Sequence, residues 1–244
     1  MAHGRDARAD GGLVVDRIYC RYGEAPALRG VSLCVPPGQV VGLLGRNGAG
    51  KTTTLNAIMG LVRLQSGRIT LDGRALDPLP AHEIPRLGIT YVPQGRRLFP
   101  SLSVLENLQM GLLVTGRGQA TLQWIFELFP VLGARLGQRA GTLSGGEQQM
   151  LAVARALCAE PGYLLMDEPS EGLMPAMTQT LLQTIRAVKA RRVGVLLVEQ
   201  KVDVALDVAD TVVLLEHGEV RHRAAPADLI GDPAVLTRYL GVRR

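Results

Sequence analysis

The sequence predicts an α/β fold in which buried parallel strands alternate with helices. A Gly-rich loop stands between an apolar, strand-like run at residues 40–44 and a helical-looking stretch at 54–61. Two further apolar runs, at 163–166 and 193–198, are nearly uninterrupted, which is typical of strands buried on both faces. From residue 101 to about 161, apolar residues recur at helical spacing. We therefore expect a parallel-stranded core that is interrupted by a mainly helical insertion.

Turn signals and local periodicity predict the other elements. The chain opens with a β-rich segment, and a Pro-Pro-Gly turn at 36–38 leads into the strand before the loop. An Asp-Gly pair at 72–73 indicates one hairpin, and a second hairpin is expected across His217-Gly218. In chain order, the further expected elements are strands at 13–18, 31–35, 67–71 and 88–93, a helix at 177–190, strands at 211–215 and 219–223, and a closing helix at 233–240.

The composition is that of an ordinary globular protein, with 47% hydrophobic and 20% charged residues among 244. No apolar run approaches the roughly 18 residues that a membrane span needs, and residues 1–12 lack the apolar centre of a signal peptide. We expect a cytoplasmic protein with a disordered tail at 1–12 and one domain at 13–242.

The cysteines Cys20, Cys34 and Cys158 are widely spaced, so neither a disulfide framework nor a metal site is indicated. The net charge of +5 is dispersed, which favours a solvated surface over a nucleic-acid partner.

The Gly-rich loop carries the full G-x-x-x-x-G-K-T pattern in the strand–loop–helix context that a phosphate loop requires. Its glycines let backbone N–H groups turn toward a polyphosphate, and the helix N-terminus adds partial positive charge. Lys51 supplies a charge for the β- and γ-phosphates, and Thr52 offers a hydroxyl to Mg²⁺. The predicted phosphate-binding residues are Gly45, Arg46, Asn47, Gly48, Ala49, Gly50, Lys51, Thr52 and Thr53. The first predicted ligand is therefore a nucleoside triphosphate, together with Mg²⁺.

Two adjacent carboxylates follow the apolar run at 163–166, where ligands of open α/β sheets usually bind. Side chains alternate along a strand, so Asp167 and Glu168 point different ways and can take different roles. We expect Asp167 to hold Mg²⁺, directly or through water, and Glu168 to act as general base toward the attacking water.

A second helix start lies about twenty residues before these carboxylates. Ser144 is a predicted N-cap, Gly145 and Gly146 bare the backbone N–H groups, and Glu147 completes a capping box. The predicted helix runs to about Leu157 and begins at a second anion-binding N-terminus. Two such ends in one chain do not both need the same phosphate, so one is expected to serve a partner.

Together, the phosphate loop, the L-S-G-G-x-Q segment at 143–148 and the Asp-Glu pair resemble the ATP-binding cassette family of ATPases, over about residues 13–242. The resemblance implies a RecA-like core with an antiparallel β subdomain and an inserted helical subdomain at about 101–161. It also implies a head-to-tail dimer that pins each ATP between one phosphate loop and the partner's Ser144, Gly145 and Gly146. Tyr22 matches the aromatic residue that stacks on adenine, and Gln94 matches the glutamine that senses Mg²⁺ and the membrane partner.

Within that family, the sequence is similar to ATPase subunits of importers for branched-chain amino acids and for urea or short-chain amides. The segments that carry this resemblance are 91–100, 104–108, 127–130 and 197–200. Gln94 and the Ser-Glu-Gly at 170–172 are more similar to the urea and amide branch, so the solute is left open between the two. The implied partners are two integral membrane permease subunits, a second ATPase subunit in a heterodimer or homodimer, and indirectly a periplasmic solute-binding protein. The implied location is the inner face of the cell membrane.

Two positions depart from the family pattern. Gln200 replaces the histidine that contacts the γ-phosphate, and an amide can donate a hydrogen bond but carries no positive charge. Met174 replaces an aspartate expected about six residues after Glu168. Our hypothesis is that this chain hydrolyses ATP slowly beside a more complete partner subunit. The alternatives are the ATPase of a lipid or polysaccharide exporter, a non-transport cassette ATPase acting on nucleic acid or ribosomes, and a non-hydrolysing binding module.

Overall fold

The N-terminal segment forms an antiparallel sheet. The computed structural model describes residues 11–113 and 118–241, so most of the predicted tail lies outside the described residues. The strands are β1 (Leu13–Tyr22), β2 (Ala25–Val35), β4 (Ser66–Leu71) and β5 (Arg74–Ala75), in the order β2-β1-β4-β5. The β-rich opening and the 72–73 hairpin are confirmed. However, β1 and β2 are longer than predicted, because a register shift beside Arg17, at φ +45°, breaks the apolar alternation of β1.

The central sheet is parallel except for its final hairpin strand. Its strands are β3 (Val40–Leu44), β6 (Ile89–Val92), β7 (Tyr163–Asp167), β8 (Gly194–Glu199), β9 (Thr211–Glu216) and β10 (Glu219–Ala224). Their order is β10-β9-β3-β8-β7-β6, and among the described residues of this sheet only the β9–β10 pair is antiparallel. Every residue of β3, β7 and β8 is buried. The uninterrupted apolar runs therefore predicted the buried strands correctly.

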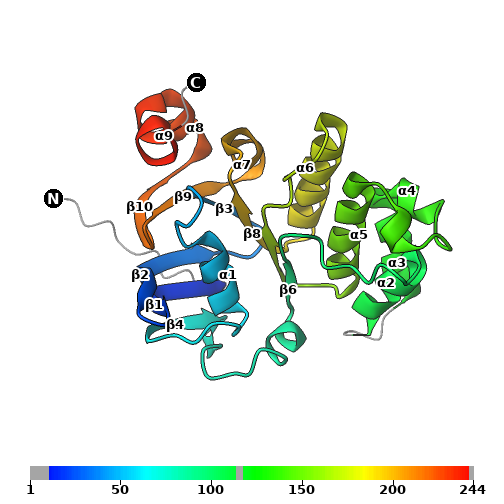
Figure 1. Ribbon diagram of the computed structural model, residues 1–244, viewed down its shortest axis with the longest axis horizontal. Coiled ribbons are helices and arrows are strands. Elements are labelled where there is room, and N and C mark those ends of the chain that lie inside the picture. Colours follow the sequence, from blue (N-terminus) through cyan, green and yellow to red (C-terminus); the bar gives the residue numbers. More distant parts are fainter. Residues whose placement is uncertain (1–10, 114–117, 242–244) are drawn as a thin grey trace.

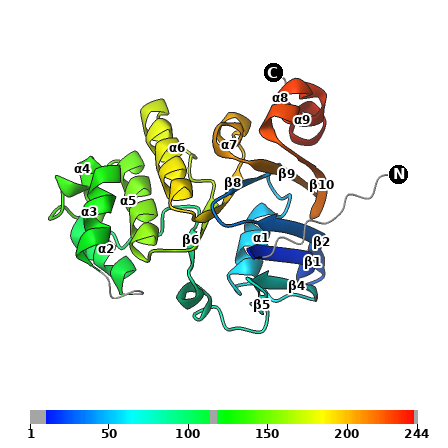
Figure 2. The ribbon, with the colours of Figure 1, turned by 180° about the vertical axis from the view of Figure 1, so that it is seen from behind.

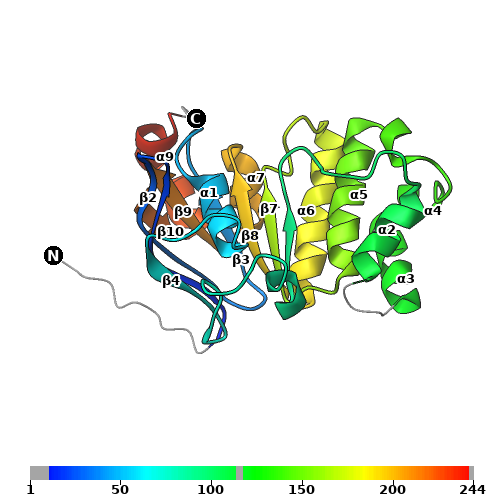
Figure 3. The ribbon, with the colours of Figure 1, turned by 60° about the horizontal axis from the view of Figure 1, so that its bottom comes forward.

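Helices cover both faces of this sheet. On one face, α1 (Lys51–Ile58) packs between the two sheets, and its Leu55 and Ile58 share an apolar cluster with β1, β2 and β8 (Figure 3). Helix α1 begins three residues before the predicted start, because Gly50 in the left-handed conformation forms its N-cap. On the other face lie α6 (Pro175–Ala190) and α7 (Val202–Val208), the second of which was not predicted. A 3₁₀ turn, Ile84–Leu87, precedes β6.

The segment predicted to be helical lies at one end of the molecule (Figure 1), and its described residues form four helices. They are α2 (Val104–Leu112), α3 (Gln119–Leu128), α4 (Pro130–Gly133) and α5 (Gly145–Cys158), with a 3₁₀ turn at Ala140–Thr142. Their apolar residues share one cluster with α6, so the helices are anchored on the core. At the other end, α8 (Pro226–Gly231) and α9 (Pro233–Leu240) pack beside β9 (Figure 2). The closing helix α9 has the predicted bounds, whereas α8 was not predicted.

The parallel strand directions determine where the polar segments meet. The phosphate loop follows β3, Glu168 follows β7, Gln200 follows β8, and Gln94 lies two residues after β6. Carboxyl ends of parallel strands lie along the same edge of a sheet. Four segments that are far apart in the sequence therefore converge at one edge.

Candidate active site

A cavity of about 700 Å³ opens at this edge and is lined by the phosphate loop. Asn47 to Thr53 form one wall, and Glu168 and Gln200 reach it from β7 and β8. Tyr22, with a relative exposure of 53%, lies on the rim of the same cavity. The structure therefore brings together the phosphate loop, Glu168 with Gln200, and the aromatic residue Tyr22.

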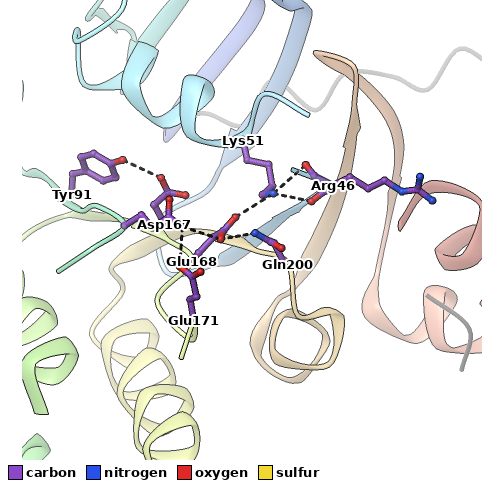
Figure 4. A network of polar contacts seen from close by, with 9 residues as sticks. Arg46, Lys51, Tyr91, Asp167, Glu168, Glu171 and Gln200 are labelled. Atoms are coloured by element: carbon purple, nitrogen blue, oxygen red, sulfur yellow. Dashed lines mark hydrogen bonds and ion pairs between the residues drawn. The ribbon is translucent and has the colours of Figure 1, made fainter. Parts of the chain in front are cut away.

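Lys51 lies at the centre of the site and is buried, with 4% of its surface exposed. Its ammonium donates hydrogen bonds to the carbonyl oxygens of Gly45, at 2.8 Å, and Arg46, at 3.3 Å. The Nζ atom is also 3.3 Å from Oε1 of Glu168, as Figure 4 shows. This arrangement holds a positive charge beside both the loop and the carboxylate. An incoming phosphate would compete with these oxygens for the same ammonium protons.

Two glycines of the loop have a steric reason to be there. A side chain at Gly45 would place its Cβ 2.4 Å from the backbone oxygen of Leu215, which is too close for any contact. Gly50 has φ +107°, and a Cβ there would lie 2.8 Å from Cδ2 of Leu28. The loop therefore lies directly against β9 and β2, and only glycine allows both approaches.

Asp167 and Glu168 take different environments, as their alternation predicted. The Tyr91 hydroxyl donates a 3.3 Å hydrogen bond to Oδ2 of Asp167, whereas Oδ1 is buried with no hydrogen-bond partner among the described residues. Burial raises the pKa of the Asp167 carboxyl, and hydrogen bonding from the Thr52 and Tyr91 hydroxyls opposes this. An unpaired carboxylate oxygen beside a threonine hydroxyl is the oxygen donor set that suits Mg²⁺, so the residues present fit that ion.

Glu168 is held from several sides. Its Oε2 accepts a 2.7 Å hydrogen bond from Nε2 of Gln200 and a 3.4 Å hydrogen bond from Nε2 of Gln94. Glu168 also has a φ of +49°, a backbone conformation that is uncommon for a non-glycine residue. Such strain is often found at functional sites, where surrounding contacts maintain it. The carboxylate is therefore fixed at the edge of the cavity, where it can accept a proton.

Some predicted site residues lie elsewhere or contribute differently. The capping box is confirmed, since the Ser144 hydroxyl accepts from the Glu147 N–H and the Glu147 carboxylate accepts from the Ser144 N–H. However, Ser144, Gly145 and Gly146 are not among the described residues that line the cavity. The Arg46 side chain points away from Lys51 (Figure 4), and its guanidinium lies beside Gly241. Arg46 therefore contributes its carbonyl rather than its charge.

Sequence reasoning missed two residues of the site. Glu171 accepts a 2.8 Å hydrogen bond from Nε2 of Gln94, and Tyr91 donates to Asp167. Because carboxylates only accept, the Gln94 amide turns its NH₂ group toward Glu168 and Glu171, and its Oε1 is the atom that can serve as a ligand for a cation. The sequence did single out both segments, but only as marks of resemblance. Their contacts depend on the pairing of β6 with β7, which no local pattern encodes.

Comparisons with known proteins agree with this geometry. A family model described as ABC transporter matches residues 28–171. The chain is 44% identical over 231 residues to the high-affinity branched-chain amino acid transport ATP-binding protein BraG of Pseudomonas aeruginosa, covering 94% of this chain and 99% of BraG. It is 36% identical over 234 residues to the lipopolysaccharide export system ATP-binding protein LptB of Acidithiobacillus ferridurans, covering 94% and 96%.

Among solved structures, the ADP conformation of MJ1267, an ATP-binding cassette of an ABC transporter, superimposes with a TM-score of 0.83. The two chains are 26% identical, and the match covers 95% of this chain and 99% of the other. The fold, the cavity around the phosphate loop and these similarities lead to one conclusion. The chain belongs to the ABC transporter family and is an ATP-binding subunit that hydrolyses ATP.

Proposed function

We propose that this chain energises an importer for branched-chain amino acids. The observation that supports this solute is the 44% identity to BraG over nearly the full length of both chains, against 36% to the export protein LptB. The site supports the coupled reaction, because Lys51, Glu168 and Gln200 form one contact network at the rim of the nucleotide cavity.

Phosphoryl transfer depends mostly on positioning and charge stabilisation. In our proposal, the loop N–H groups and Lys51 bind the phosphates, and Tyr22 stacks on the adenine. Glu168 accepts the proton of the attacking water as general base, while Gln200 orients Glu168 and contacts the γ-phosphate. Thr52, Asp167 and Gln94 would hold Mg²⁺. When bound, Mg²⁺ neutralises charge that develops on the phosphate oxygens.

The start of α5 supports a dimer in this proposal. It opens a 14-residue helix with two glycines and lies outside this chain's own nucleotide cavity. A helix N-terminus attracts anions, so Ser144, Gly145 and Gly146 would bind the γ-phosphate held by a second ATPase subunit. Met174, exposed at 74%, is the N-cap of α6 and takes the place of the expected aspartate. With Gln200, it supports our hypothesis of slow hydrolysis beside a more complete partner.

Membrane coupling requires partners. No helix within residues 11–113 and 118–241 has both the length and the apolar character to cross a bilayer. We propose that ATP binding closes the dimer and that closure moves two integral permease subunits through the region around residues 94–108. The subunit would then lie on the inner face of the cell membrane, with a periplasmic solute-binding protein acting indirectly through the permease.

One experiment tests the chemistry, and a second tests the solute. Glu168→Gln should leave ATP bound but nearly stop turnover, and single-turnover hydrolysis at the wild-type rate would exclude Glu168 as the base. For the solute, the chain is purified with its partners from detergent-solubilised native membranes and reconstituted into vesicles. ATP-dependent uptake of leucine, with none of urea, is the expected result. Uptake of urea or acetamide instead would contradict the proposed solute.

A further inference from the structure

A buried carboxylate that the proposed chemistry does not use lies directly before Gln200. Glu199 is the last residue of β8 and has a relative exposure of only 2%. Its Oε1 accepts a 2.9 Å hydrogen bond from the backbone N–H of Ser170, which is itself fully buried. Burying a carboxylate costs free energy, which its hydrogen bonds must offset.

Glu199 belongs to a set of contacts between two short segments. One segment, 168–170, carries the proposed base, and the other, 198–201, carries Gln200. Besides the Ser170–Glu199 contact, three hydrogen bonds join them. The Glu168 N–H donates to the Val198 carbonyl at 2.9 Å, the Gln200 amide donates to the Glu168 carboxylate at 2.7 Å, and the Lys201 ammonium donates to the Ser170 carbonyl at 3.0 Å. The base and its hydrogen-bond donor are therefore tied together at both backbone and side chain.

These hydrogen bonds hold a segment whose backbone is strained. Glu168 has φ +49°, so the turn from Glu168 to Ser170 would gain by relaxing toward a commoner conformation. Relaxation would carry the Ser170 N–H away from Glu199. Because a buried N–H without a partner is unfavourable, the acceptor on Glu199 opposes that movement. Burial raises the pKa of the Glu199 carboxyl, and the backbone N–H groups of Ser170, Lys201 and Gln200 oppose the rise.

We propose that Glu199 is a positioning residue for ATP hydrolysis. Through the Ser170 N–H it holds the strained turn that presents Glu168, and so it keeps the Glu168 carboxylate within hydrogen-bond distance of Gln200. The inference rests on the role of Glu168 given under the proposed function. It assigns Glu199 no contact with nucleotide, so the affinity for ATP should not depend on it.

The test measures kcat and KM for ATP of the purified full-length chain. Glu199→Ala should lower kcat about tenfold or more with KM unchanged, because it removes the acceptor but touches no substrate. Glu199→Gln keeps an oxygen in place for Ser170, and its kcat should stay within about threefold of wild type. In a Glu168→Gln background, Glu199→Ala should lower the residual rate no further, since the base that it positions is gone.

Asp210→Ala is the matched control. Asp210 also accepts a backbone N–H through its carboxylate, from Val40 at 2.8 Å, but at the opposite edge of the same sheet. Its kcat per folded molecule should stay within about twofold of wild type, with folding of every variant checked by thermal melting. An equal loss in Asp210→Ala would reduce the Glu199 effect to general loosening and overturn the proposal.

Other outcomes also decide the matter. The positioning role would be overturned by any of three results. The first is a wild-type kcat in Glu199→Ala, and the second is that Glu199→Ala lowers kcat by the same factor in the Glu168→Gln background. The third is a kcat of Glu199→Gln as low as that of Glu199→Ala. If Glu199→Ala does not fold, Glu199→Asp replaces it, because a side chain one methylene shorter draws the carboxylate away from Ser170. A fall in kcat of about fivefold would support the proposal, and an unchanged kcat would overturn it. Wild-type turnover of Glu168→Gln alone would instead overturn the base assignment.

Discussion

The Nε2 group of Gln200 donates a 2.7 Å hydrogen bond to Oε2 of Glu168. Each residue follows the end of a parallel strand, β8 and β7, so the sheet itself brings the two side chains together. An amide donates without changing its protonation state near neutral pH, whereas a histidine titrates there. The contact therefore orients the carboxylate over the whole physiological pH range.

Replacing Gln200 by leucine removes this donor. We expect kcat to fall about ten- to a hundredfold, since a hydrogen bond to a charged group contributes about 1.5–3 kcal/mol. Steady-state ATPase rates check this, and Gln200→His serves as the matched variant because an imidazole can still donate. A leucine variant as fast as wild type would mean that Glu168 needs no partner on β8.

Removing the Lys51 ammonium should weaken nucleotide binding. The Lys51→Ala substitution deletes the charge held by the Gly45 and Arg46 carbonyls and by Glu168. We expect the Kd for ATP to rise at least about tenfold, because charge-assisted contacts to phosphate are among the strong ones. Equilibrium binding of a fluorescent ATP analogue measures this. Lys189→Ala, which loses only a partly exposed ion pair with Asp210, is the control. Equal affinities of the two variants would contradict the assignment of Lys51.

Packing of α2 against α5 should tolerate no side chain at Gly111. A Cβ there would lie 2.2 Å from the backbone oxygen of Arg155, so α2 and α5 would have to separate. We expect Gly111→Ala to lower the free energy of unfolding by about 2 kcal/mol, as overpacking does, despite the better helix propensity of alanine. Gly137→Ala should change little, because among the described residues no atom beyond its chain neighbours lies within 4 Å of the added Cβ. Denaturant titration compares them, and two equally stable variants would contradict this packing.

The sequence predicted the parts of the site that local chemistry encodes. The phosphate loop, the capping box at Ser144 and the strand before Asp167 each depend on residues a few positions apart, and the structure has all three. It did not predict the Gln94–Glu171 contact or the direction of the Arg46 side chain. Those depend on which strands pair and on where α9 lies, and both are tertiary features.

Some predicted bounds were wrong, and one helix was missed, for physical reasons of the same kind. Strand β1 continues past a bulge at Arg17 that breaks the alternation of apolar residues, so the pattern ended before the strand did. Helix α7 has only seven residues, too few to display a helical period, and its burial against the sheet stabilises it. Long apolar runs were predicted best, because burial on both faces leaves little choice of residue.

The pKa of Glu199 gives a pH dependence of stability. Burial raises this pKa in the folded protein, so between its unfolded value, about 4.3, and its folded value the folded state binds more protons than the unfolded state. The stability from this group is therefore fully present below the unfolded pKa and is lost as the pH rises through the folded pKa. Glu199→Gln lacks this loss, so its free energy of unfolding should improve relative to wild type as the pH rises. Urea titrations across pH 5–8 measure the difference, and a constant difference would contradict the raised pKa.

Arg191 and Trp124 join the end of α6 to α3 in the helical segment. The Arg191 guanidinium lies 3.8 Å from the centre of the Trp124 ring, a cation–π contact. Trp124 is the only tryptophan of the chain, so tryptophan fluorescence reports on the surroundings of this one ring. Arg191→Ala should uncover the ring to water, shift the emission to longer wavelength and lower the free energy of unfolding by about 1 kcal/mol. Arg192→Ala makes the same change in net charge one residue away and should leave the emission unchanged. If both variants shift the emission equally, the effect comes from charge and not from stacking, and the shared apolar cluster alone would hold the helical segment against α6.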